Sequence, residues 1–154
     1  MKKHSPEWWQ ALPPEKVGKE CEKLVEALFK KWNDKAYFSW HRLPDAKAAR
    51  GAIAAQPADY AWWRRPDGGY LEVKATQHEY RLPKDKIRQL PLLQKHAMAG
   101  AQSLVLIHHY TIGKWRIVKA MDLATDVPSW DLRSYPTYDS AERALTSTLL
   151  FSGL

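Results

Sequence analysis

Two short runs of strand-forming residues, joined by a turn sequence, set the strongest limit on what this chain can fold into. Residues 59–65 read DYAWWRR, residues 69–75 read GYLEVKA, and PDGG lies between them at residues 66–69. Aromatic and β-branched residues favour strands, whereas proline and glycine favour turns. The pattern therefore predicts a β-hairpin whose turn spans residues 66–69.

Further elements are expected on both sides of this hairpin. Apolar residues recur at helical spacing in the first segment, and Pro91 should interrupt a later helix. The elements expected are helices over 17–32, the second half of 83–100 and 139–150, and strands over 36–41, 59–65, 69–75, 103–110 and 115–120. This order predicts an α/β (α+β) fold with a central mixed sheet of about five strands flanked by helices.

The composition indicates what kind of partner the chain binds. The 154 residues fit one domain, with residues 1–15 as an N-terminal extension. Lys and Arg number 24 against 17 Asp and Glu, which gives a formal net charge of +7. That charge favours an anionic partner, with nucleic acid as the first choice.

Several classes of protein are disfavoured. No apolar run reaches the roughly 18 residues of a membrane-spanning helix, and the first residues lack the apolar stretch of a signal peptide, so we expect a cytoplasmic protein with no membrane partner. Phosphate-binding and serine-hydrolase motifs are absent from the sequence, so we expect no nucleotide cofactor. The single cysteine, Cys21, excludes an internal disulfide, and its place on the apolar helix stripe indicates a core residue.

Three ionisable residues of the hairpin form the best candidate site. Alternate side chains of a strand share a face, so Glu72 and Lys74 lie on the same side. Pairing across the turn places Asp59 close to them. Carboxylates from adjacent strands suit Mg²⁺, and an ammonium beside them suits phosphate chemistry. The alternative is a solvated surface strand, with Asp59 capping a turn.

Neighbouring pairs of aromatic residues and histidines favour packing roles. His108 and His109 are adjacent in a strand and face opposite ways, so they cannot bind one ion from regular β structure. One of Trp62 and Trp63 should face the core, while the other faces a helix or a partner, or stacks on a base if it is exposed.

The hairpin resembles a known nuclease motif. PADY at residues 57–60, followed after the hairpin by LEVKATQ at 71–77, looks like the PD-(D/E)XK motif. Within that superfamily, D-Y, hairpin, then E-x-K-x-T is similar to the RecU-type Holliday-junction resolvases, phage versions included. The resemblance covers residues 18–118. It implies a restriction-endonuclease-like fold, a homodimer, Mg²⁺ with Mn²⁺ as a substitute, and paired nicks in four-way DNA junctions within a bacterial cell or phage-infected host.

The resemblance also implies roles for the hairpin residues. Asp59, Glu72 and the carbonyl of Val73 would hold the metal, and Lys74 would act on the nucleophile. Gln77, which ends the LEVKATQ run, is a candidate DNA contact.

A further acidic residue is implied on the first helix, at Glu20. On a helical wheel Glu20 borders the apolar stripe, and Glu22 and Glu26 are expected on the opposite, solvated face. The alternative is that Glu20 pairs with Lys23 or Lys16 on the surface.

The same family carries a glutamine on the helix after the lysine strand. Gln89 matches that place best, and Gln94 is the other choice. The family usually has a His-Gln pair there, whereas this chain has Arg88 before Gln89, which leaves the role of Gln89 open.

Residues 42–57 match the place of the stalk that RecU proteins insert into the junction. The stretch is short, and we expect a basic loop or arm whose Arg42, Lys47 and Arg50 reach DNA; a surface loop with incidental basic residues is the alternative. Two rival functions stay open: a nuclease of the same fold acting on linear duplex or single-stranded DNA, and a non-catalytic DNA-binding module.

Overall fold

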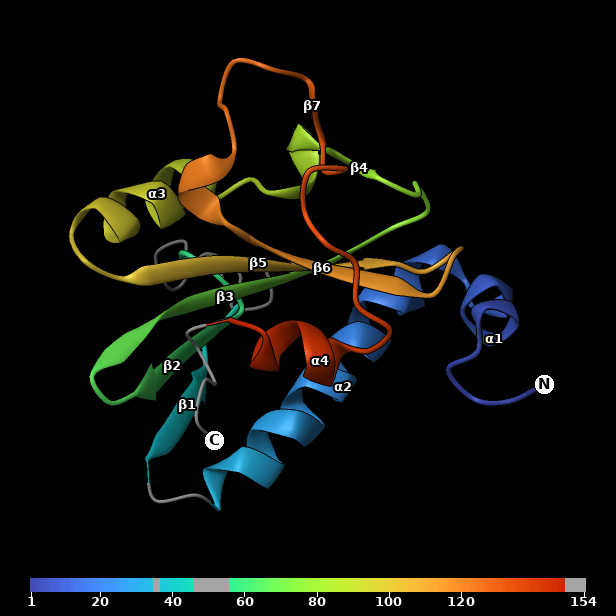
Figure 1. Ribbon diagram of the computed structural model, residues 1–154, viewed down its shortest axis with the longest axis horizontal. Helices are drawn as coiled ribbons and strands as arrows, with labels where there is room; N and C mark the ends of the chain where they lie inside the picture. Colours follow the sequence, from blue (N-terminus) through green and yellow to red (C-terminus); the bar gives the residue numbers. More distant parts are fainter. Residues whose placement is uncertain (35–36, 46–55, 149–154) are drawn as a thin grey trace.

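A five-stranded mixed sheet forms the centre of the molecule, with helices on both faces (Figure 1). The computed structural model describes residues 1–34, 37–45 and 56–148. The strand order is β1-β2-β3-β5-β6. The strands are β1 (Phe38–Arg42), β2 (Tyr60–Arg64), β3 (Asp67–Thr76), β5 (Gln102–His109) and β6 (Lys114–Lys119). The expected class, a central mixed sheet of about five strands flanked by helices, is confirmed.

Only one pair of neighbouring strands in this sheet is parallel. β3 and β5 run parallel, whereas the other neighbours run antiparallel. A parallel pair needs a long crossover. The crossover contains β4 (Arg81–Pro83), the 3₁₀ turn η1 (Lys84–Lys86) and α3 (Leu90–Met98). Figure 1 shows α3 and β4 together on one side of the sheet.

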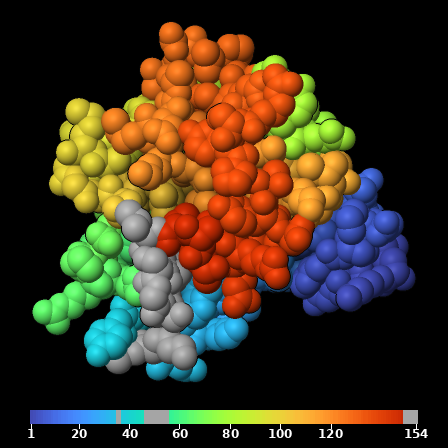
Figure 2. Space-filling view, viewed as in Figure 1, coloured from blue at the N-terminus to red at the C-terminus, as the bar shows by residue number. Residues whose placement is uncertain are grey.

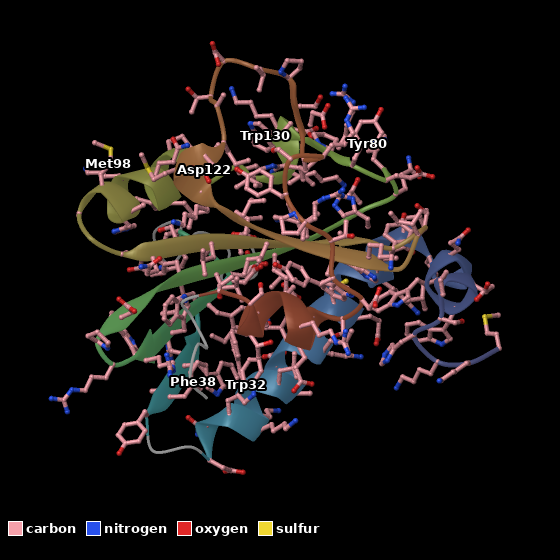
Figure 3. The ribbon with its side chains drawn as sticks, in the orientation of Figure 1. Trp32, Phe38, Tyr80, Met98, Asp122 and Trp130 are labelled. Atoms are coloured by element: carbon pink, nitrogen blue, oxygen red, sulfur yellow. The ribbon has the colours of Figure 1, made fainter. Side chains whose placement is uncertain are left out.

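The other face of the sheet is covered by α2 (Pro14–Asn33) and α4 (Ala141–Thr146). The apolar stripe of α2 lies against the sheet, because helical spacing brings these residues onto one side. The buried residues of α2 are Val17, Cys21, Val25, Phe29 and Trp32. Trp32 and Phe38 lie close together in this core, with ring centroids 6.1 Å apart (Figure 3).

A second core fills the crossover face. Its residues come from β4, α3, η2 (Ala120–Asp122) and β7 (Ser129–Asp131), from the inner face of β5 and β6, and from Ile87 just after η1. β4 pairs with β7 in a small two-stranded sheet. Trp130 of β7 is buried in this layer (Figure 3), and its indole nitrogen donates a hydrogen bond to the Ala124 carbonyl at 2.8 Å. This layer positions η1 and the start of α3 above β3.

The hairpin turn is shorter than the sequence predicts. Arg65 and Pro66 alone connect the strands, because β3 already begins at Asp67. Gly69 therefore belongs to the strand, where a Cβ atom would lie 2.1 Å from the Gln102 carbonyl oxygen. Glycine there serves close packing of β3 against β5 rather than the turn.

The expected interruption of the helical segment 83–100 is seen, since η1 is a short piece and α3 a longer one. The break lies before Pro91, which occupies the first turn of α3, where proline is tolerated. The N-terminal extension contains a short helix, α1 (Pro6–Ala11), that the sequence did not indicate. The last helix ends at Thr146, and part of its expected range lies outside the described residues.

The adjacent pairs face opposite ways. Trp62 is fully buried, whereas Trp63 is 58% exposed. His108 stacks on Trp115, and His109 bonds to the carbonyl of His78, so the two imidazoles lie on different faces. Both histidines are buried, and they are the last two residues of β5.

The chain after β6 covers the β6 edge of the sheet. Tyr138 forms two backbone hydrogen bonds of 2.8 Å with Trp115, which protects this edge from further strand pairing. Figure 2 shows the same segment as a continuous band that runs from the β7 side to α4. Among the described helices, none combines the length and apolar character needed to cross a membrane.

Candidate active site

The candidate site lies where β3 continues beyond its neighbour β2. β2 pairs with β3 only as far as Leu71, which lies opposite Tyr60, whereas β3 runs on to Thr76. Residues 72–76 still pair with β5 but have an open edge on the β2 side. Figure 1 shows this part of β3 extending toward the first half of α2. An open strand edge offers backbone groups to a ligand.

Asp59, just before β2, occupies the first position of this open edge. Its Oδ2 accepts a hydrogen bond of 2.8 Å from the Val73 backbone N–H. A strand residue directs its N–H and its C=O to the same side. The carbonyl of Val73 therefore also faces the open edge, next to the Asp59 carboxylate.

Glu72 and Lys74 complete the group on β3. The Glu72 carboxylate lies 3.1 Å from the Lys74 ammonium, and Glu72 is only 6% exposed. Burial, together with the Asp59 carboxylate, raises the pKa of Glu72 to about 8 against the opposing effect of Lys74. A buried carboxylate beside a second carboxylate is held at an electrostatic cost. The structure thus brings together Asp59, Glu72 and Lys74.

These residues line a groove made of two adjoining cavities of about 540 and 520 Å³. One wall is the first half of α2, and the other is η1 with residues 88–89 just before α3. The residues that line both cavities are Lys19, Glu22, Asp59, Lys74 and Lys86. The groove therefore runs along the open edge of β3 with the carboxylates at its centre.

The helix carboxylate in the groove is Glu22 and not Glu20. Glu20 forms an ion pair of 3.0 Å with Lys23 and does not line the groove. Glu22 lines both cavities, and burial followed by the charge of Asp59 raises its pKa. The structure therefore places Glu22 in the groove, whereas the sequence predicts Glu20 at this site and Glu22 on the solvated face.

The physical reason is that the apolar stripe of α2 has two borders. Cys21 lies at its centre, so Glu20 and Glu22 fall on opposite sides of it. The Glu22 border faces the β1–β2 side, where the Tyr60 hydroxyl donates to the Glu22 carbonyl at 3.4 Å. The expectation of a solvated face for Glu22 overlooks this second border, and only the packing of α2 on the sheet shows which border meets the start of β2.

Arg42 lies at the end of a strand, whereas it is expected in a loop or arm. It ends β1 instead of belonging to an arm, and its guanidinium donates to the Tyr60 hydroxyl at 2.8 Å. It also lies 3.5 Å from Glu22 and 3.8 Å from Glu26. Arg42 therefore ties two α2 carboxylates to the sheet at the groove rim. The other two arm candidates, Lys47 and Arg50, lie outside the described residues.

The three candidate glutamines differ in where they lie relative to the groove. Gln89 precedes α3 and lines the groove beside Glu72, with no side-chain capping bond. Gln94 donates to the carbonyls of Ala120 and Leu123 at 3.0 and 2.8 Å, so it ties α3 to η2. Gln77 is exposed at one end of the groove. Gln89 is therefore the glutamine placed next to the carboxylates.

The donor set fits a hard divalent cation. In the described ranges no three His, Cys, Asp or Glu side chains form a ready-made metal cluster. Mg²⁺ does not require one, since it commonly binds one or two carboxylates, keeps several waters and accepts a backbone carbonyl. Asp59, Glu72 and the Val73 carbonyl supply that set, and a cation would relieve the repulsion between the carboxylates.

Comparison with known proteins gives a likeness of fold. No protein-family model matches the chain, and no curated protein matches it. A solved structure that resembles it is Hjc, a Holliday junction resolvase from the archaeal hyperthermophile Archaeoglobus fulgidus. The alignment has a TM-score of 0.50 and 21% identity, and it covers 80% of this chain and 98% of that one. The chain therefore shares its fold with an archaeal junction resolvase.

Proposed function

We propose that this protein is a metal-dependent endonuclease that cuts four-way DNA junctions. The observation that carries the proposal is the meeting of Asp59, Glu72 and Lys74 at the open edge of β3, inside a groove. The fold shared with a junction resolvase and the net charge of +7 support it. Fold alone does not determine activity, so the residues of the site carry more weight than the shared fold.

The carboxylates of the site would hold Mg²⁺, with Mn²⁺ as a substitute. Asp59, Glu72 and the Val73 carbonyl supply its ligands, and Glu22 takes the place expected for Glu20 in holding the ion or its water. The bound ion supplies charge stabilisation at the scissile phosphate and a water of lowered pKa.

Lys74 and Gln89 act on the reacting groups from two elements. The Lys74 ammonium, held 3.1 Å from Glu72, orients the attacking water and stabilises negative charge that develops on the phosphate. Gln89 lines the same cavity from the start of α3, where its amide can bond a phosphate oxygen.

The two carboxylates, Asp59 and Glu72, also favour a nuclease over a protein that only binds DNA. A surface that only binds DNA gains nothing from two carboxylates, which repel phosphates unless a cation lies between them. The non-catalytic alternative therefore leaves the buried position of Glu72 without a purpose.

Junction selectivity and a homodimer are the finer parts of the proposal. Two-fold symmetry would supply two active sites for paired nicks on opposite strands. The likeness to RecU-type enzymes comes from the PADY and LEVKATQ runs, and the solved relative in fold is an archaeal resolvase.

The experiment compares a labelled four-way junction with a linear duplex of matched sequence. Wild type and Glu72→Gln are each incubated with Mg²⁺ and with EDTA, and the cleaved strands are mapped. We expect symmetrical nicks in the junction alone, dependent on both Mg²⁺ and Glu72. Equal cutting of both substrates would contradict the junction preference, and tight binding without any cutting would contradict the nuclease.

A further inference from the structure

The cations of the groove fall into two groups. Arg42 and Lys74 are already paired with carboxylates. Lys19, Lys86 and Arg88 have no carboxylate within 4.0 Å and no side-chain hydrogen bond in the part of the chain that the structure describes. These three charges are therefore available to an external anion.

Other basic residues near the groove walls are occupied or lie elsewhere. Lys23 pairs with Glu20, and Lys31 lies 3.4 Å from Glu142. Lys84 of η1 donates to the carbonyl of Thr125. Lys23, Lys31 and Lys84 are thus held within the protein, whereas Lys16 and Lys30 of α2 form no ion pair among the described residues but do not line the groove. Their place in the groove distinguishes Lys19 and Lys86 from a generally basic surface.

The unpaired cations lie on opposite walls. Lys19 belongs to α2, and Lys86 belongs to η1, yet each lines both cavities of the groove. Arg88 lines the cavity that contains Glu72 and Gln89. Positive charges therefore lie on both sides of the carboxylates. They can bind the phosphates on either side of a phosphate that lies at the carboxylates, as in a DNA strand.

Gly18 leaves space on the α2 wall beside Lys19. It is exposed and lines the groove, and a Cβ atom at Gly18 would meet no atom within 4 Å. Packing within the described chain therefore does not require glycine at this helical position. A missing side chain does permit a bulky ligand backbone to approach the helix closely.

We infer that Lys19, Lys86 and Arg88 form a phosphate clamp that holds one DNA strand along the open edge of β3, with Gly18 leaving room for its backbone. This inference rests on the proposed function for its ligand, DNA. Phosphates on either side of the scissile one are repelled by the acidic centre, and the clamp offsets that repulsion.

The test measures binding without cleavage. A labelled four-way junction is titrated in EDTA over a range of NaCl concentrations with wild type, Lys19→Ala, Lys86→Ala and Arg88→Ala. Each clamp variant should reduce the slope of log K against log salt by about 0.9, because each removes one phosphate contact. Lys30→Ala, an exposed position on the same helix, is the matched control and should leave the slope unchanged.

A second variant tests whether the DNA backbone passes close to Gly18, without changing the charge of the protein. Gly18→Val places a branched side chain in the groove, so it should weaken junction binding several-fold while it leaves the salt slope at the wild-type value. Thermal melting of each variant establishes that the fold is intact.

The outcomes separate this inference from the proposed function. If Lys19→Ala and Lys86→Ala bind like Lys30→Ala, the clamp is refuted even in a protein that cuts junctions. If the slopes fall as expected in a protein that cuts no DNA, the clamp stands and the nuclease is refuted.

Discussion

The carboxylate of Asp59 takes the place of a missing strand partner: its Oδ2 accepts the Val73 N–H at 2.8 Å, beyond the last residue pair of β2 and β3. One hydrogen bond thereby satisfies an open strand edge and fixes a carboxylate beside Glu72. The same arrangement directs the Val73 carbonyl toward the groove. The proposed metal site therefore follows from the unequal lengths of β2 and β3.

The two helix glutamates should differ in their effect on cleavage. Glu22→Gln should lower the cleavage rate about 10- to 100-fold, because Glu22 lines the groove beside Asp59. Glu20→Gln is the matched control and should cut like wild type, since Glu20 pairs with Lys23 outside the groove. Single-turnover rates in Mg²⁺ compare them, and loss of activity in Glu20→Gln alone would restore the assignment made from sequence.

Without metal, the Glu72→Gln variant should become more stable than the wild type as the pH rises. The pKa of Glu72 is raised from 4.5 to about 8, so between these values the folded state binds more protons than the unfolded state. Its contribution to the free energy of unfolding then falls with rising pH and levels off above about 8. In EDTA, the difference in melting temperature between the two proteins should grow to several degrees across this pH range. That difference corresponds to roughly 1 kcal/mol or more in the free energy of unfolding.

Metal binding should release a proton near neutral pH. Because the raised pKa leaves Glu72 protonated there, a cation must displace that proton to bind. Calorimetry of Mg²⁺ binding in buffers of different ionisation enthalpy should report release of about one proton at pH 7 and less above pH 8. A binding enthalpy that hardly changes with the buffer at either pH would show that Glu72 is not a ligand.

Arg42 should contribute more to stability than to DNA binding. Arg42→Ala leaves Glu22 and Glu26 without their shared cation, and we expect a loss of about 1 kcal/mol because the partly exposed pairs are screened by solvent. Arg42→Lys should recover part of that loss, since one ammonium replaces the charge but not the geometry. An unchanged melting temperature with a reduced salt slope for DNA would instead make Arg42 a phosphate contact.

Two glycines should respond oppositely to alanine. Gly18→Ala should raise the free energy of unfolding by up to ~1 kcal/mol, because alanine favours a helix and a Cβ meets no atom there. Gly69→Ala should destabilise the protein, because its Cβ would lie 2.1 Å from the backbone of Gln102. Urea unfolding measures both, and stabilisation by Gly69→Ala would contradict the close packing of β3 on β5.

The hairpin shows which features of the site can be predicted from the local sequence pattern. Alternation along LEVKA predicts that Glu72 and Lys74 share a face, and strand pairing predicts the approach of Asp59, because both follow from two-residue periodicity. The turn was placed too late because Gly69 was attributed to a turn, whereas it is needed for contact with Gln102. That contact is between strands distant in sequence, so no local rule reports it.

The choice between Glu20 and Glu22 depends on tertiary structure. Both border the stripe that contains Cys21, and only the placement of α2 across the sheet decides which one meets Asp59. Arg42 was expected at DNA because its charge is visible in sequence, while its partners on α2 are not. Pairing of charges between distant elements is the information that the sequence lacks.

The most direct test of the account is cleavage by Asp59→Asn beside wild type and Glu20→Gln, on a labelled four-way junction in Mg²⁺. Asparagine keeps an oxygen that can accept the Val73 N–H, so the fold and junction binding should persist. We predict that Asp59→Asn cuts about a thousandfold more slowly, equivalent to ~4 kcal/mol of transition-state stabilisation, while Glu20→Gln cuts normally. Wild-type cleavage by a folded Asp59→Asn would contradict the central claim.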